Sequence, residues 1–220
     1  YLNSIKKNQW QPTASMIGFS QEDYSTLETI KKTGGIVPDQ HWEKNKEKIL
    51  QAIELTASLN IKFLTFHFGF IENSDYELRE KVRFLADVAE QNNIMILMES
   101  GQESAESLKE FLVKLSHPAL GVNFDPANMI LYDKGDPVSA LETLTPWVKH
   151  IHIKDARRSA VAGQWGEEVP WGDGDFDNYE FLKTLNRIGY QGALAIEREA
   201  GSKRLEDIQH AALSLSQFSF

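Results

Sequence analysis

The sequence predicts an α/β fold, a TIM-type (β/α)8 barrel, in a single domain covering residues 1–220. Two observations favour this fold. Short apolar runs alternate with helix-like segments along the chain, which is typical of parallel βαβ units. Polar residues stand at the ends of several runs, and the strand ends of a barrel converge on one face. A closed barrel needs eight strands and six are clear, so we expect the first strand and part of the first helix to precede residue 1.

The first half of the chain already shows this alternation. Residues 1–7 resemble the end of a helix, and the run TASMIGFS at 13–20 is the first visible strand. A polar, turn-rich stretch then leads to a helix over 42–59, where apolar residues recur at helical spacing. The run FLTFHFGF at 63–70 has the composition of a strand, and a helix is expected from about 76 to 91.

The middle of the chain repeats the pattern with shorter turns. The run IMILMES (94–100) predicts a strand, and Ser104 is placed to begin a helix with an apolar stripe. LGVNFDPAN (120–128) predicts the next strand. A short helix is expected after the Asp136-Pro137 pair, because aspartate caps helices and proline favours their first turn. VKHIHIKD (148–155) is the fifth strand.

The last third contains a long loop, two helices and the sixth clear strand. The loop passes Trp171, and a short strand near 167–171 is the candidate for the eighth barrel strand. A helix at 177–188, the strand GALAIERE at 192–199 and a helix at 204–217 complete the pattern. An open doubly wound sheet is the alternative fold. It is disfavoured because no glycine-rich phosphate loop joins a first strand to a helix.

Four polar residues at strand ends are the candidate functional group. They are Glu99, Asp125, His152 and Glu197, each at or near the C-terminal end of one apolar run. Because side chains alternate faces along a strand, the run at 148–155 turns its histidines and lysine inward and its isoleucines outward. Enclosed carboxylates need a partner, because burying an unpaired charge is costly. Three carboxylates and one imidazole would form an oxygen-rich site for a divalent metal.

Neighbouring residues leave some of these assignments open. Glu199 lies on the same strand face as Glu197, so either residue could be the ligand. His152 is preferred to His150 because it is nearer the strand end. His67 is either a hydrogen-bonded core histidine or a substrate ligand. Taken alone, each carboxylate could also cap the following helix or pair with a basic neighbour.

Composition excludes several classes of function. The 220 residues are 41% hydrophobic and 25% charged with a net charge of −9, so we expect no nucleic-acid partner and no membrane partner. The absence of cysteine excludes disulfides and thiolate metal sites within these residues. No apolar run approaches the ~20 residues of a membrane span, and the first residues do not form a signal peptide. A small-molecule partner and a cytoplasmic location are expected, and homo-oligomerisation is left open.

The order and spacing of these motifs resemble the xylose isomerase-like barrels, also called the sugar phosphate isomerase/epimerase family. The motifs are HxG at 67–69, Glu99, DPAN at 125–128, HIHIKD at 150–155, GDGDFD at 172–177 and GYQGALAIE at 189–197. The resemblance covers most of the chain and implies a TIM barrel with one divalent metal. It implies that the ligands are Glu99, Asp125, His152 and Glu197, and that Glu99 and Glu197 form a catalytic acid/base pair.

The expected activity is metal-dependent isomerisation or epimerisation of a sugar, a sugar phosphate or a keto-polyol, by proton transfer between two carboxylates. Mn²⁺ or Mg²⁺ is preferred for this ligand set, with Zn²⁺, Co²⁺ and Fe²⁺ as alternatives. Contacts with a carbohydrate substrate are expected from His67, Asn128, His150, Lys154, Arg157 and Trp171.

Other functions of the same family remain as alternatives. A dehydratase acting on an inositol- or shikimate-type substrate shares the metal set and the first proton abstraction. An AP endonuclease is disfavoured, because Asn128 stands where those enzymes carry a histidine and because the acidic chain would repel a DNA backbone. A non-catalytic ligand-binding barrel is the remaining alternative.

Overall fold

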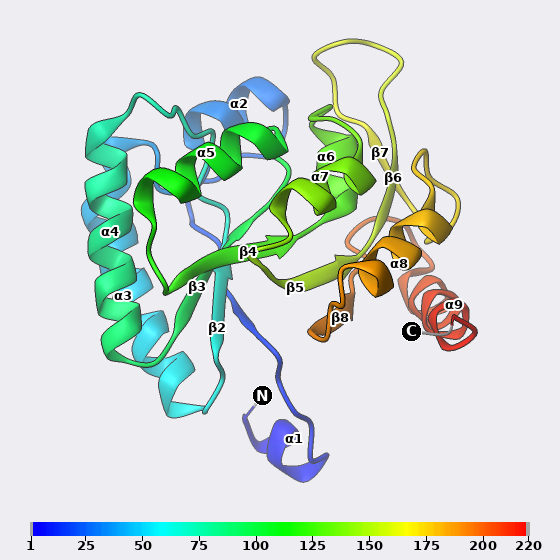
Figure 1. Ribbon diagram of the computed structural model, residues 1–220, viewed down its shortest axis with the longest axis horizontal. Coiled ribbons are helices and arrows are strands. Elements are labelled where there is room, and N and C mark those ends of the chain that lie inside the picture. The colour runs from blue at the N-terminus through cyan, green and yellow to red at the C-terminus, as the bar shows by residue number, and fades with distance from the viewer. Residues whose placement is uncertain (1, 219–220) are drawn as a thin grey trace.

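The computed structural model describes residues 2–218, and its centre is a curled, open sheet of six parallel strands (Figure 1). In sheet order the strands are β1 (Ser15–Met16), β2 (Phe63–Phe66), β3 (Met95–Glu99), β4 (Leu120–Phe124), β5 (Val148–Ile153) and β8 (Ala193–Ile196). Every neighbouring pair is parallel. The predicted α/β architecture of alternating strands and helices is confirmed.

Helices connect the strands and lie against the sheet. Their bounds are α1 (Leu2–Lys7), α2 (Leu27–Thr33), α3 (Trp42–Ser58), α4 (Tyr76–Gln91), α5 (Ala105–Leu115), α6 (Pro126–Leu131), α7 (Pro137–Leu144), α8 (Asn178–Arg187) and α9 (Arg204–Ser216), with a 3-10 turn at Asp39–His41. The helices predicted after residue 40 are confirmed, with ends that differ by at most a few residues. Over residues 2–218, no helix is both long and apolar enough to cross a bilayer.

Two short helices, α2 and α6, were not expected. In α6 the carboxylate of Asp125 accepts a hydrogen bond from the Asn128 N–H (3.0 Å), and Pro126 occupies the first helical turn. These are the usual features of a helix start, so the segment expected to continue the strand is a helix. In α2 the cap is a reciprocal pair of threonines, Thr26 and Thr29, which lacks the glutamate or glutamine that marks such a start in a sequence.

A separate antiparallel hairpin holds the region where an eighth barrel strand was expected. It consists of β6 (Asp155–Arg157) and β7 (Glu167–Val169). The prediction of a barrel strand near 167–171 is wrong, because β7 pairs with the segment directly after β5 and not with a strand of the main sheet. The loop of this hairpin carries Trp165.

The apolar core lies between the sheet and the surrounding helices. Leu64 and Ile151, on strands β2 and β5, belong to one buried cluster with Ile53 of α3 and Leu85 of α4. Figure 1 shows α3 and α4 together beside β2 and β3, with α9 on the β8 side. Thr65, also on β2, faces the other way and donates a hydrogen bond to the carboxylate of Glu99 on the neighbouring strand β3. The predicted alternation therefore separates an apolar outer face from a polar inner face.

One buried acid outside the predicted site affects stability. Glu103, between β3 and α5, accepts a hydrogen bond from the Ile71 N–H (3.2 Å) and is 8% exposed. Burial raises the pKa of Glu103 from 4.5 to about 8. The folded protein therefore binds this proton more tightly than the unfolded chain does. By linkage, the free energy of unfolding decreases as pH rises from about 4.5 to about 8. The stabilisation that protonated Glu103 contributes is fully present only below about pH 4.5.

We expect Glu103→Gln to flatten the pH dependence of stability, because glutamine has no proton to lose. The measurement is thermal denaturation at a series of pH values from about 5 to 8. The parent protein should lose stability more steeply over this range than the variant. Glu106→Gln, on the exposed first turn of α5, is the matched control and should keep the parent slope. If stability depended equally steeply on pH in the parent and in Glu103→Gln, Glu103 would not be the group that causes the pH dependence.

Candidate metal centre and active site

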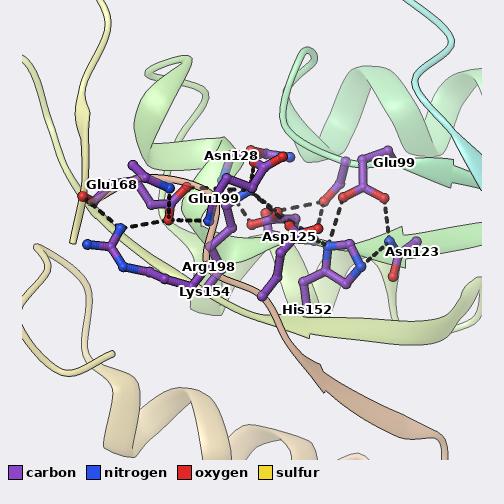
Figure 2. Close-up of polar contacts among 12 residues, drawn as sticks. Glu99, Asn123, Asp125, Asn128, His152, Lys154, Glu168, Arg198 and Glu199 are labelled. Atoms are coloured by element: carbon purple, nitrogen blue, oxygen red, sulfur yellow. Dashed lines mark hydrogen bonds and ion pairs between the residues drawn. The ribbon is translucent and has the colours of Figure 1, made fainter. Parts of the chain in front are cut away.

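The four predicted metal ligands lie together at the C-terminal ends of the strands. Glu99 ends β3, Asp125 directly follows β4, His152 is near the end of β5 and Glu197 directly follows β8. The Nδ1 atom of His152 lies 3.1 Å from Glu99 Oε1, 3.2 Å from Glu197 Oε2 and 3.5 Å from Asp125 Oδ2. Figure 2 shows one imidazole nitrogen facing these carboxylates and the other facing Asn123.

Two buried atoms at the centre of the cluster lack hydrogen-bond partners. They are His152 Nδ1 and Asp125 Oδ2. Ligand atoms of Glu99, Asp125 and His152 all lie within 4.8 Å of one another, and all three residues are buried. One imidazole nitrogen and several carboxylate oxygens around an unsatisfied point are donors that a divalent cation accepts. The residues present therefore fit a divalent metal.

Glu197 differs from the other three residues. It lies outside the compact triad of Glu99, Asp125 and His152. Its Oε2 is shared between His152 Nδ1, at 3.2 Å, and the ammonium group of Lys154, at 2.9 Å. Its side chain is 24% exposed, whereas that of Glu99 is 1% exposed. Glu197 is therefore the carboxylate of the cluster that a ligand in solution can reach most easily.

The electrostatics of the cluster favour positive charge at its centre. Burial alone would raise the pKa values of Glu99 and Glu197, but interaction with His152 outweighs it. The pKa of Glu99 falls below its usual range and that of Glu197 falls to about 2. Burial alone would lower the pKa of His152, but the negative charge of Glu99 and the other carboxylates close to its Nδ1 raise it well above its usual value. The carboxylates of Glu99 and Glu197 are thus ionised at neutral pH.

Asn123 connects Glu99 to two histidines. Its Nδ2 donates to Glu99 Oε2 and lies 3.1 Å from His152 Nε2, and its Oδ1 is 2.8 Å from His150 Nδ1. The other nitrogen of His150 is 3.0 Å from Thr13 Oγ1. Burial, followed by the charge of His152, lowers the pKa of His150 to about 4, so this imidazole is neutral at neutral pH. His150 is hydrogen bonded to Asn123 and does not line the cavity described next, although the sequence predicted that it contacts the substrate.

A cavity of about 680 Å³ opens over the cluster. Its wall includes Glu99, Glu197 and Lys154, together with His67 and Asn128, two of the residues expected to contact substrate. The remaining lining residues are Met16, Ile17, Gly18, Glu22, Tyr24, Leu131, Tyr132, Trp165, Glu199 and Ala200. Most of these come from loops and from the end of α6, where no repeating pattern in the sequence distinguishes them.

Lys154 is surrounded by carboxylates. Its Nζ atom lies 2.9 Å from Glu197 Oε2, 2.5 Å from Glu199 Oε2 and 3.6 Å from Asp125 Oδ2. Burial alone would lower the pKa of Lys154, but these carboxylates, Asp125 first among them, raise it above its usual range. The ammonium group is therefore charged and already paired with carboxylates.

Glu168, on β7, holds the segment that follows β8. Its Oε1 accepts hydrogen bonds from Arg198 Nη1 (2.6 Å) and from the backbone N–H groups of Glu199 (2.9 Å) and Ala200 (3.1 Å). Arg198 also donates from Nε to Asp207 Oδ2 (2.9 Å). The hairpin thereby fixes the backbone next to Glu197. Glu168 was missed at the sequence level, because a three-residue strand has too little periodicity to indicate which face it buries.

Two residues expected to contact substrate lie away from the cavity. Trp171 is 5% exposed and packs against Phe176 and Phe181, with ring centroids 5.9 and 6.5 Å apart. It borders a different cavity, of about 320 Å³, between α8 and α9. Arg157 is exposed and donates from Nε to the Asp173 carbonyl (2.9 Å). The reason is that the chain leaves the barrel sheet after Ile153 and enters the hairpin, so strand alternation no longer places these side chains.

Asp155 organises the loop that carries Trp171. Its Oδ2 accepts hydrogen bonds from the N–H groups of Gly172 (2.9 Å) and Gly174 (3.1 Å) and from Asn178 Nδ2 (3.0 Å). A Cβ atom at Gly174 would lie 1.7 Å from Asp155 Oδ1, so this position requires glycine. Asp155 is 1% exposed. Its carboxylate therefore has a structural role in closing the loop.

We expect Asp155→Ala to lower the free energy of unfolding by about 3 kcal/mol, because several donors lose their only charged acceptor. Urea denaturation of the variant and of the parent measures this difference. Asp173→Ala, an exposed aspartate in the same loop, is the control and should stay within about 0.5 kcal/mol of the parent. A variant at position 155 as stable as the control would show that the loop does not depend on this carboxylate.

Comparisons with known proteins bear on the fold. A family model described as xylose isomerase-like TIM barrel matches residues 24–218. The crystal structure of a xylose isomerase domain protein from Planctomyces limnophilus is 33% identical, with a TM-score of 0.91 over 97% of this chain and 78% of that chain. The structure of a D-tagatose 3-epimerase-like protein is 22% identical, with a TM-score of 0.74 over 99% of this chain and 80% of that chain.

Curated relatives match over shorter stretches. Inosose dehydratase from Clostridium tetani is 23% identical over 64% of this chain and 53% of its own length. 3-Dehydroshikimate dehydratase from Bacillus anthracis is 28% identical over 39% of this chain and 32% of its own length. The chain thus spans about half the length, or less, of these relatives. A xylose isomerase-like barrel from Mycobacterium smegmatis, solved with magnesium, is 21% identical, with a TM-score of 0.67 over 92% of this chain and 72% of that chain.

Proposed function

The chain belongs to the xylose isomerase-like TIM barrel family, and from this membership we propose that it is a divalent-metal-dependent enzyme that moves a proton beside a carbonyl group of a small polyhydroxylated substrate. One observation carries the proposal. Two ionised carboxylates, Glu99 and Glu197, lie within about 3.2 Å of the same unsatisfied nitrogen of His152, and both line one cavity.

Four side chains hold the metal in this proposal. The ligands are Glu99, Asp125, His152 and Glu197, with Asn123 keeping His152 and Glu99 in place. When bound, a divalent cation polarises a carbonyl oxygen and stabilises negative charge on it. Mn²⁺ and Mg²⁺ suit the three oxygen donors, and the single imidazole also permits Zn²⁺.

The two glutamates carry the proton in this proposal. Glu197 Oε2 takes a proton from the substrate carbon beside the carbonyl, and it is ready to do so because its low pKa keeps it ionised. Glu99, across the cluster, takes a proton from water in the cavity and delivers it to the neighbouring carbon, with transfer of the hydroxyl proton to the former carbonyl oxygen, or to the opposite face of the same carbon. The first outcome is isomerisation and the second is epimerisation. The proton held by Glu197 passes back to water, so that both carboxylates are regenerated.

Dehydration is the second candidate, and it is favoured by the names of the curated relatives, inosose dehydratase and 3-dehydroshikimate dehydratase. It begins with the same proton abstraction. The electron pair left on carbon then forms a C=C bond as a neighbouring hydroxyl group departs, and that group takes a proton to leave as water. In this candidate mechanism the ammonium group of Lys154, 2.9 Å from Glu197, donates this proton.

The experiment that tests the proposal uses Mn²⁺-loaded protein in D₂O with D-fructose or 2-keto-myo-inositol, followed by NMR. Deuterium at the carbon beside the carbonyl, without loss of water, supports isomerisation or epimerisation. An unsaturated product supports the dehydratase. A sample treated with EDTA should give neither result. If no ketone is deuterated or dehydrated by the metal-loaded protein, the proposal is wrong.

A further inference from the structure

The charges around the cavity distinguish between classes of substrate. We infer that this site takes an uncharged polyhydroxy ketone and rejects analogues that carry a phosphate or carboxylate group. The inference deepens the proposed function and rests on it, because it concerns the same cavity. Four of the lining residues are glutamates, namely Glu22, Glu99, Glu197 and Glu199. Among the lining residues, Lys154 is the only lysine or arginine.

Lys154 is not free to bind an anion. It is 3% exposed, and its Nζ atom already contacts Glu197 at 2.9 Å and Glu199 at 2.5 Å. A phosphate on this ammonium group would leave those carboxylates without their cation and beside a new negative charge. Breaking such a buried pair is strongly unfavourable.

The metal does not change this conclusion. With Asp125 directly under the cavity, the site holds five carboxylates against one lysine and one divalent cation. A neutral His152 as ligand adds no charge. Two negative charges therefore remain uncompensated, and a ligand with a further negative charge is repelled.

Basic residues around the cavity are also engaged elsewhere. Arg198 is paired with Glu168 and Asp207, and its side chain is 9% exposed. Lys48 donates to the carbonyl of Gly18, a residue of the lining, at 2.5 Å. None of these side chains contributes to the lining. Among the described residues that line the cavity, no lysine or arginine is thus free to hold a phosphate.

The unpaired polar groups in the wall suit neutral oxygen atoms. Trp165 Nε1 and His67 Nδ1 are both buried without a hydrogen-bond partner, and both residues line the cavity. An indole N–H is a neutral donor, and hydroxyl and carbonyl oxygens accept from it. The rings of Tyr132 and Trp165, with centroids 4.8 Å apart, add an apolar wall for the C–H face of a polyol.

The test compares matched pairs of ligands by calorimetry at low ionic strength, with Mn²⁺-loaded protein freed of excess metal. The pairs are D-fructose with D-fructose 6-phosphate, and 2-keto-myo-inositol with 3-dehydroshikimate. We expect the neutral member to bind at least about tenfold more tightly in at least one pair, and the anionic member to be favoured in neither. An anionic member that binds more tightly than its neutral partner in either pair, less than about a tenfold preference for the neutral member in both pairs, or no saturable binding of either neutral ketone would overturn the inference.

A variant tests the reason for the discrimination. Glu199 has a side chain that is 67% exposed, and Glu199→Gln removes its charge while keeping its shape. This releases Lys154 from one ion pair, so the affinity of the anionic member relative to that of the neutral member should rise at least about threefold. Glu167→Gln, an exposed change on β7, should alter neither. An unchanged ratio in Glu199→Gln would show that charge does not set the preference.

The two proposals fail in different ways. Neutral ketones that bind but exchange no deuterium would contradict the proposed function and leave the inference standing. Anionic ketones that bind preferentially and exchange deuterium would support the proposed function and overturn the inference.

Discussion

Replacing Asp125 by alanine is expected to abolish the stabilisation of the protein by divalent metal. Asp125 is 0% exposed, and its Oδ2 faces the centre of the cluster without a hydrogen-bond partner. A metal that binds only the folded state stabilises it, by about 2.7 kcal/mol at a free concentration of 100 times Kd. Chelation should therefore lower the melting temperature of the parent, and Mn²⁺ should restore it. The variant should show neither change.

Two further variants separate metal binding from other roles of aspartate. Asp125→Asn keeps the oxygen that caps α6 but removes the charge, so it should also lose most of the response. Asp87→Ala is the control, from the exposed cluster of Asp87, Glu90 and His117. In that cluster His117 Nδ1 accepts a hydrogen bond from the Ala119 N–H (3.1 Å), so in the neutral ring Nε2 carries the proton. Neither ring nitrogen of this tautomer is then a free electron-pair donor for a metal, which makes the cluster a suitable control. A metal response retained in Asp125→Ala, or lost in Asp87→Ala, would contradict the proposed ligands.

Glu99→Gln and Glu197→Gln are each expected to reduce turnover by about 10²-fold or more, because glutamine keeps the shape but cannot accept a proton. Deuterium uptake by a bound ketone gives the rate, and Mn²⁺ content measured on the same samples separates lost chemistry from lost metal. Glu167→Gln should retain the parent rate. Full activity in both variants at positions 99 and 197 would rule out the proton-transfer pair.

The inner face of the sheet was predictable because strands have a strict period of two. Once the apolar runs were placed, the alternation predicted that His150, His152 and Lys154 point inward and that Glu99 stands at a strand end. The contacts of His152 with Glu99 show these residues brought together as expected. Their proposed role in metal binding remains a prediction.

Residues outside the strands were much harder to place. Trp171 was expected to contact the substrate because an aromatic side chain can form an apolar wall against a sugar ring, yet it packs against Phe181. The contact of Tyr132 with Trp165 was not predicted, because Tyr132 ends a short helix and Trp165 lies on a hairpin loop. Their proximity depends on how distant segments meet, which the local sequence does not encode.

The bonds made by Glu168 have a consequence for motion. The amide protons of Glu199 and Ala200 lie on an exposed segment, yet both are donated to a carboxylate of the hairpin strand β7. Their exchange with solvent deuterium then requires both hydrogen bonds to Glu168 to break. Because one carboxylate oxygen accepts from both amides, we expect the two protons to exchange at the same rate, and their protection measures how firmly the hairpin is attached to the backbone next to Glu197.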